Sequence, residues 1–141
     1  MAVPATSNDE GNMKIKLTSL MVENQDAALR FYTEVLGFRK LMEVPAGEYK
    51  WISVVSPDGY PDVQLSLEPN ANPAGKTYQQ ALFTQGIPAA AFEVDDIQAE
   101  YNRLRSQGVV FTKEPTRAGP VTIAIFSDTC GNLIQMYQPP R

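Results

Sequence analysis

Residues 47–59 read GEYKWISVVSPDG, and residues 119–131 read GPVTIAIFSDTCG. Both stretches run from glycine to glycine over the same length, with a β-rich middle and a Ser/Asp turn before the second glycine. The same offset relates LTSLMVEN at residues 17–24 to AAAFEVDD at residues 89–96, and DVQLSLEP near residue 64 corresponds to LIQMYQPP near residue 135. The chain therefore contains an internal repeat, which is a stronger indicator of fold than local propensity.

Each half reads as a strand, a helix and three further strands. Asn24 can cap the first helix and Gly37 can end it, while Asp95 or Asp96 and Gly108 do the same for the second helix. Alternation predicts strands at residues 14–22, 39–44, 50–55 and 62–68 in the first half, and near 109–112, 121–127 and 132–137 in the second. The first strand of the second half lies within residues 89–96, which correspond to residues 17–24.

The repeat also divides the chain. We expect a mobile tail at residues 1–13, modules at 14–70 and 88–141, and a proline-rich linker at 71–87 with a short helix near residues 79–83.

Composition narrows the possible functions. The chain has 141 residues, 43% apolar and 20% charged, with a net charge of −4. These values indicate a soluble globular domain, and the absence of a basic block argues against nucleic-acid and anionic-membrane partners. No apolar run approaches the ~20 residues of a membrane span, and the first residues do not resemble a signal peptide.

Two residue types limit the chemistry. Cys130 is the single cysteine, so an intrachain disulfide is impossible, which suits a reducing cytoplasm. The chain has no histidine, which removes catalytic triads and imidazole-based metal sites. Any general base must be Asp, Glu, Lys or Tyr.

Three motifs extend the repeat, namely LMVENQDAALRFYTEVLGF, FEVDDIQAEYNRLRSQGV and DTCGNLIQMYQPP. Together they resemble the vicinal oxygen chelate superfamily, which includes glyoxalase I, bleomycin resistance proteins and extradiol dioxygenases, over nearly all of residues 14–140. The resemblance implies an α+β fold in which two tandem βαβββ modules form curved mixed sheets around a cavity. It also implies a homodimer.

In metal-dependent members of that superfamily, the ligands are His, Gln or Glu on the first and last strands of each half. By motif these positions fall here on Leu17, Gln64, Ala89 and Gln135. Leu17 and Ala89 have no donor atoms, and the two glutamines offer neutral amide oxygens, which are weak ligands for a divalent cation. We therefore expect no metal and no other cofactor.

Strand alternation assigns the remaining side chains to faces. Leu20, Val22, Ile134 and Met136 should face the helices. The residues expected to face the cavity with Leu17 are Ser19, Gln64, Ser66, Gln135 and Tyr137. Trp51 could stack on a planar ligand with Ser53 beside it, or pack in the core or a dimer interface. The two amides could hold a ligand through N–H donation, or bond each other or nearby backbone.

Glu68 shares the face of Gln64, and Glu93 shares that of Ala89, so each is a candidate pocket acid or a solvated strand end. Cys130 is either a reactive thiol or an inert turn residue.

We favour a metal-free protein that binds a small molecule, aromatic or antibiotic-like. A metal-dependent lyase, isomerase or dioxygenase that uses Gln64, Glu68, Glu93 and Gln135 stays open, as does a structural module with a collapsed cavity.

Overall fold

A computed structural model describes residues 11–141 of the chain, so part of the tail expected at residues 1–13 lies outside the described residues. The first module comprises β1 (Leu17–Val22), α1 (Gln25–Arg30), the π-helical turn η1 (Phe31–Val35), β2 (Arg39–Ala46), β3 (Tyr49–Val55) and β4 (Gln64–Pro69). Helix α2 (Pro73–Gln85) connects it to β5 (Ala90–Glu93), α3 (Ile97–Ser106), β6 (Phe111–Ala118), β7 (Val121–Ser127) and β8 (Leu133–Gln138).

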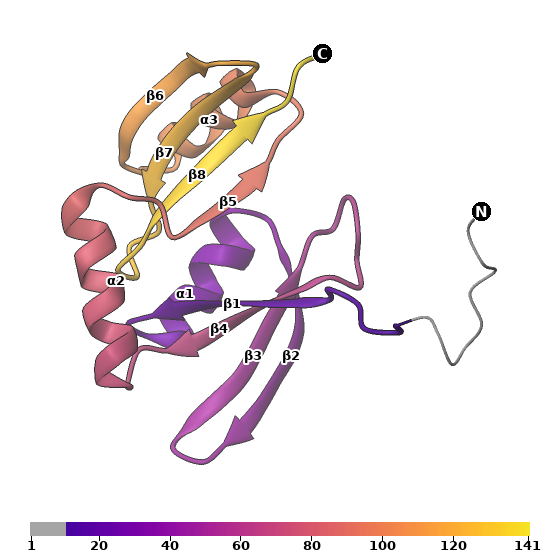
Figure 1. Ribbon diagram of the computed structural model, residues 1–141, viewed down its shortest axis with the longest axis vertical. Coiled ribbons are helices and arrows are strands. Elements are labelled where there is room, and N and C mark those ends of the chain that lie inside the picture. Colours follow the sequence, from indigo (N-terminus) through magenta and orange to yellow (C-terminus); the bar gives the residue numbers. More distant parts are fainter. Residues whose placement is uncertain (1–10) are drawn as a thin grey trace.

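Each module forms one four-stranded sheet. Sheet A has the order β1-β4-β3-β2, and sheet B has the matching order β5-β8-β7-β6. The first and last strands of each module run parallel, and the other neighbours run antiparallel. Sheet A occupies the lower part of Figure 1 and sheet B the upper part. The expected α+β fold of two βαβββ modules is confirmed.

Side-chain capping explains where the module helices begin. The Asn24 side chain accepts a hydrogen bond from the Ala27 N–H at 2.9 Å, and Asp96 accepts one from the Ala99 N–H at 3.1 Å. Such caps satisfy backbone donors that the first helical turn leaves free. Both caps lie at positions that the sequence predicts.

The linker helix is longer than the short helix expected near residues 79–83, because α2 spans Pro73–Gln85. Asn72 caps it by accepting from the Ala74 N–H at 2.9 Å, and Pro73 occupies the first turn, where its missing N–H leaves no bond unmade. Gly86, in the left-handed conformation with φ 74°, ends it. Pro73, one of the prolines of the expected proline-rich linker, thus marks the start of a helix.

The edge strands also extend further than expected. Strand β6 covers Phe111–Ala118, although the sequence predicts only residues 109–112, and it contains Pro115. It pairs with β7 alone, with register shifts on both sides of Lys113. Proline is tolerated at such an irregular edge because no second neighbour needs its N–H.

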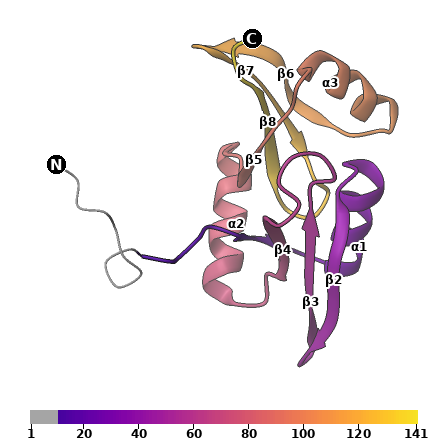
Figure 2. The same ribbon diagram turned by 90° about the vertical axis from the view of Figure 1, so that its right-hand side faces the viewer.

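The two faces of each sheet differ. We call the side packed against α1 or α3 the helix face, and the opposite side the distal face. Figure 2 shows α1 and α3 on the same side of their sheets and α2 on the other. Leu20, Val22, Ile134 and Met136 are all at most 5% exposed and belong to the helix-face core, as strand alternation predicts.

One hydrophobic core joins the modules. Phe31 of η1 packs near Phe126 of β7, with ring centroids 6.4 Å apart, and Phe38 meets Phe92 of β5 edge-on at 5.2 Å. The buried cluster draws residues from both sheets and from α1 and α3. Among the helices of residues 11–141, none has the length and apolar character needed to span a bilayer.

A buried polar junction links the modules to the linker. Its four side chains are Tyr32, Gln79, Asp128 and Asn132, each at most 4% exposed. The Tyr32 hydroxyl donates to Asp128 Oδ2 at 2.6 Å, and Asn132 Nδ2 donates to the same oxygen at 2.9 Å. The backbone N–H groups of Cys130 and Asn132 donate to Asp128 Oδ1 at 2.7 and 3.0 Å. The carboxylate therefore accepts four hydrogen bonds, which offset the cost of burying it.

Gln79 of α2 completes the junction. Its Nε2 donates to the Met21 carbonyl at 2.9 Å and to Asn132 Oδ1 at 3.1 Å, and its Oε1 accepts from Asn70 Nδ2 at 2.8 Å. Gly131 must leave room for it, because a Cβ there would lie 2.8 Å from Gln79 Nε2. Gly131 also has φ 97°, which L side chains rarely adopt.

Candidate functional site

The six residues expected to bind a ligand lie on the distal faces of the two sheets. Ser19 is on β1, Trp51 on β3, and Gln64 and Ser66 on β4, so sheet A holds four of them. Gln135 and Tyr137 lie on β8 of sheet B. Since their strand neighbours Leu65, Leu67, Ile134 and Met136 are buried, alternation directs the six side chains away from α1 and α3.

The middle of sheet A carries a row of serines across three strands. The ladders pair Ser19 with Ser66 and Ser66 with Ser53. Ser53 and Ser66 are fully buried, while Ser19 is exposed. The adjoining row pairs Leu17 with Gln64 and Gln64 with Val55. Three short hydroxyl side chains and one amide thus form the polar centre of this face.

Within residues 11–141, two polar atoms of this centre have no hydrogen-bond partner. They are the Ser53 hydroxyl oxygen and Gln64 Oε1, and both are inaccessible to solvent. The neighbouring Ser66 hydroxyl donates to Glu68 Oε2 at 3.3 Å. Buried polar groups in folded proteins are nearly always paired, so these two atoms are exceptions, and because neither has solvent-accessible surface, neither is open to a ligand in this structure.

Apolar side chains surround the polar centre. Met42 of β2 pairs with Ser53 and is 39% exposed, and Val44 pairs with Trp51 and is 43% exposed. Leu17 is 47% exposed, and Trp51 is half-buried. Large apolar side chains around a small number of polar groups are the usual make-up of a small-molecule site.

The distal face of sheet B has the same arrangement of strands as that of sheet A, but it carries different side chains. Gln135 pairs with Ala91 on one side and Ile125 on the other, and Tyr137 pairs with Glu93 and Ile123. The residue opposite Gln135 is therefore Ala91, whereas Leu17 lies opposite Gln64. Ala89, the position carried over by motif, donates its N–H to the Leu133 carbonyl at the start of β8.

Gln64 and Gln135 lie on corresponding faces but in different sheets. Neither amide lines either of the two cavities that we describe among residues 11–141. Convergence of the two amides in one cavity stays a prediction.

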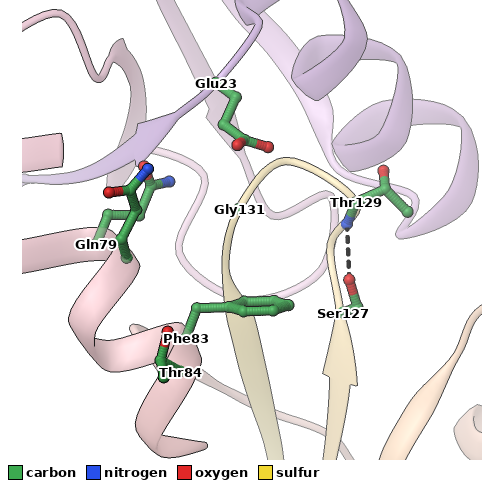
Figure 3. Close-up of a pocket in the computed structure, with 8 residues that line it drawn as sticks. Glu23, Gln79, Phe83, Thr84, Ser127, Thr129 and Gly131 are labelled. Carbon is green, nitrogen blue, oxygen red and sulfur yellow. Dashed lines mark hydrogen bonds between the residues drawn. The ribbon is translucent and has the colours of Figure 1, made fainter. Parts of the chain in front are cut away.

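The first of these cavities has a volume of about 540 Å³ and lies between α2 and the β7–β8 turn. Figure 3 shows Phe83 extending from α2 toward this turn, and Glu23 approaching the turn from the other side. Thr129 in its wall has φ 62°, an uncommon conformation for a β-branched residue. Its lining comprises Glu23, Gln79, Gln80, Phe83, Thr84, Ser127, Thr129 and Gly131. Sequence reasoning missed this cavity, because its walls come from α2 and from the β7–β8 turn, which no local pattern brings together.

The second cavity, of about 740 Å³, lies between the β3–β4 loop and the start of α3. Phe126 and Met136 reach it from the core, and Asp58, Glu93 and Asp95 line it from the surface. Glu93 is exposed here and belongs to sheet B, whereas Glu68 is half-buried in sheet A.

The residues present do not fit the metal site of metal-dependent relatives. Leu17 and both alanines near Gln135 lack donor atoms, and the two glutamines contribute no charge. Glu68 and Glu93, the acids considered as substitutes, belong to different sheets. Within residues 11–141, no three His, Cys, Asp or Glu side chains gather into a possible metal-binding group.

Cys130 has the properties of a structural residue. It is 2% exposed, and burial together with the nearby Asp128 carboxylate raises the pKa of its thiol to about 11. Thiolates are the reactive form of cysteine, so this thiol is held in its unreactive state at neutral pH.

Comparisons with known proteins agree with this architecture. The chain is 58% identical over 126 residues to the uncharacterized protein YurT of Bacillus subtilis, covering 89% of this chain and 99% of that one. It is 31% identical over 130 residues to the lactoylglutathione lyase of Haemophilus influenzae, covering 89% and 93% of the two chains.

Among solved structures, TnmS3, described as an antibiotic binding protein from Streptomyces sp. CB03234, superposes with a TM-score of 0.73 and 27% identity, covering 92% of this chain and 98% of that one. A model of the Glyoxalase/Bleomycin resistance protein/Dioxygenase superfamily matches residues 14–136. The chain therefore belongs to the Glyoxalase/Bleomycin resistance protein/Dioxygenase superfamily.

Proposed function

We propose that this protein binds an organic small molecule, without a metal, on the distal faces of its sheets. The polar side chains of Ser19 and Gln64 on the distal face of sheet A carry this proposal, because Ser19 is exposed and Gln64 is half-buried, so both residues are at the surface. The exposed apolar side chains of Leu17, Met42 and Val44 beside them supply a surface that excludes water from a bound ring.

The ligand-binding residues of the proposal are Ser19, Trp51, Gln64, Ser66, Gln135 and Tyr137. Sheet A contributes the polar centre and the indole of Trp51, and sheet B contributes the second amide and a phenol ring. The similarity to an antibiotic-binding protein supports an aromatic or antibiotic-like ligand.

Two copies of the chain form the complete site in this proposal. The two distal faces belong to separate sheets, and in this proposal a second copy brings a sheet A face against a sheet B face. The buried single cysteine and the absence of any possible intrachain disulfide support a cytoplasmic location.

A thermal-shift screen tests the proposal against the enzyme hypothesis. A ligand that binds only the native state raises the melting temperature by mass action, so aromatic compounds and antibiotics should include stabilisers. Zinc, nickel, iron and manganese should give no comparable shift, and protein purified without chelator should contain no stoichiometric metal. One bound metal per chain, or formation of lactoylglutathione by the purified protein, would overturn the proposal in favour of the lyase to which the chain is similar.

Substitution of the amides gives a second test. Gln135→Leu and Gln64→Leu keep most of the side-chain volume and remove a polar handle, so each should weaken binding of a stabiliser by about 1–3 kcal/mol, roughly 5- to 150-fold. The fold should survive, since an apolar group replaces a polar one. Unchanged affinity in both variants would place the ligand elsewhere. The cavity between α2 and the β7–β8 turn would then be the next site to test.

A further inference from the structure

The second cavity, between the β3–β4 loop and the start of α3, lies apart from the residues proposed to bind a ligand on the distal faces. Its volume of about 740 Å³ is in the range of cavities that hold small molecules. Figures 1 and 2 show the β3–β4 loop extending from sheet A toward sheet B, and this loop forms one wall of the cavity. None of the six residues of the proposed function lines it, so it is a separate candidate site.

The wall opposite the loop is apolar and partly open. Phe38 and Phe92 both line the cavity, with their ring centroids 5.2 Å apart and their planes 88° to each other. Both rings are half-buried, as are Leu36 and Val94 beside them. These side chains therefore keep surface that a ligand can cover. An aromatic ring suits this surface, since rings pack on one another edge-to-face or offset.

The rim of the cavity carries negative charge that the chain leaves uncompensated. Asp58 of the loop, Glu93 of β5 and Asp95 after it all line the cavity and are exposed. Within residues 11–141, none of the three carboxylates forms an ion pair. No lysine or arginine is among the described residues that line the cavity. A ligand with a positive charge would thus meet attraction at the rim and no competing cation.

The other two acids of the lining are already engaged. Asp96 caps α3 by accepting from the Ala99 N–H at 3.1 Å, and Glu100 accepts from Arg103 Nη2 at 2.8 Å. The carboxylates that stay available come from two different segments, the loop and the end of β5.

This spread favours an organic cation over a metal ion. Within residues 11–141, no three His, Cys, Asp or Glu side chains come close enough to hold a metal. An ammonium group needs only one or two carboxylates as acceptors, and it also gains from a nearby aromatic face.

We propose that the second cavity binds a small aromatic ammonium ion. The ring of the ligand lies against Phe38 and Phe92, and its ammonium group lies at the rim formed by Asp58, Glu93 and Asp95. This site goes beyond the proposed function and does not depend on it, because the two sites share no residue.

Matched probes separate the contributions of charge and ring. Phenethylamine is an aromatic ammonium ion, 2-phenylethanol is its neutral analogue, 3-phenylpropionate is an anionic one, and butylamine has the charge without the ring. Titrations up to about 10 mM at low salt, followed by protein NMR shifts, detect the weak binding expected of such small compounds. Phenethylamine should bind at least about 5-fold more tightly than each of the other three, because only it uses both the rim and the aromatic wall. Raising the salt to about 500 mM should reduce its advantage over 2-phenylethanol to within about two-fold.

The NMR shifts also locate the probe. Binding in the second cavity should move the backbone amide signals of Gly59, Val94 and Ala99, which line it. The indole N–H signal of Trp51, on the distal face of sheet A, should not move.

Charge variants assign the preference to the rim. In the double variant Asp58→Asn, Glu93→Gln, phenethylamine should bind within about two-fold of 2-phenylethanol, because most of the attraction at the rim is gone. The double variant Glu48→Gln, Glu114→Gln is the matched control. Both of its residues are exposed and line neither cavity, so it changes the net charge equally and should keep the full preference.

Four results would overturn the inference. The first is equal binding of phenethylamine and 2-phenylethanol, or no binding of either, by the unmodified protein. The second is binding of butylamine as tight as that of phenethylamine, which would remove the role of the aromatic wall. The third is the same loss of preference in both double variants, which would assign the effect to net charge. The fourth is a shift of the Trp51 signal without shifts at the cavity, which would assign the probe to the distal face, refute this site and leave the proposed function standing.

Discussion

A buried carboxylate in the β7–β8 turn depends on a tyrosine of the first module. Tyr32 donates to Asp128 Oδ2 at 2.6 Å and is fully buried. Tyr32→Phe removes one donor from a buried anion, so we expect the free energy of unfolding to fall by about 1.5–3 kcal/mol in urea titrations. Tyr60→Phe is the control, because Tyr60 is 78% exposed, and it should change stability by less than about 0.5 kcal/mol. Equal effects of the two substitutions would contradict the importance of this bond.

The Tyr32 phenol of the junction and the neighbouring Cys130 thiol make the free energy of unfolding depend on pH in the alkaline range. The pKa of Cys130 is raised from 9.0 to about 11, first by burial and then by Asp128. Burial and Asp128 likewise raise the pKa of Tyr32 above 10.0. For a raised pKa, the folded state keeps its proton longer, so the stabilisation is complete below the unfolded pKa and is lost as the pH rises.

Stability should therefore begin to fall above pH 9.0, as unfolded Cys130 starts to ionise. In Cys130→Ala the fall should begin only near pH 10.0, where unfolded Tyr32 ionises. Urea unfolding at a series of pH values measures both onsets. Identical profiles for the two proteins would show that the thiol does not contribute.

The helix-face residues could be predicted from the sequence, and the polar junction could not. Leu20, Val22, Ile134 and Met136 follow from strand alternation, which a local pattern reveals. Asp128 reads locally as a turn residue, because its hydrogen bond to Tyr32 spans 96 positions. Nothing in the neighbourhood of either residue indicates that they meet.

At the scale of elements, α2 is fixed in place by one side chain. Gln79 is 4% exposed and bonds to both modules, whereas the next residue, Gln80, is exposed. Gln79→Leu leaves the Met21 carbonyl, Asn70 Nδ2 and Asn132 Oδ1 with fewer partners, so we expect a loss of roughly 2–3 kcal/mol in unfolding free energy. Gln80→Leu should be nearly neutral. Similar stabilities of the two variants, measured by urea unfolding, would refute a docking role for Gln79.

The repeat predicted the same succession of strand, helix and three strands in both modules, and the two sheets share one spatial strand order, since equivalent sequences adopt equivalent topology. It predicted the position of the site less completely. Gln64 and Gln135 correspond in sequence and lie on corresponding faces, yet the β5–β8 register places Ala91 rather than Ala89 opposite Gln135. Register between parallel strands depends on backbone pairing, which neither hydrophobic alternation nor the offset of a repeat determines.

At the scale of the whole molecule, the two distal faces lead to a prediction about assembly. We expect a homodimer at tens of micromolar, with the interface near β1 and α2, measured by sedimentation velocity. Leu17 lies on the distal face of β1 and is 47% exposed, so Leu17→Glu should weaken association about 10-fold or more by placing a charge in an apolar contact. Val110→Glu, at a residue that is 65% exposed outside β1 and α2, should not. A monomeric parent protein would contradict the predicted assembly.

The polar junction has a consequence for the order in which the chain acquires structure during synthesis. Tyr32 and Met21 leave the ribosome long before Gln79, and Asp128 follows almost at the end of the chain. Until then the first module has a tyrosine hydroxyl and a carbonyl that only later segments can pair. Its share of the common core is also incomplete before β7 and β8 emerge. The nascent first half is therefore expected to stay loosely structured, and the last residues translated complete the folding of the first.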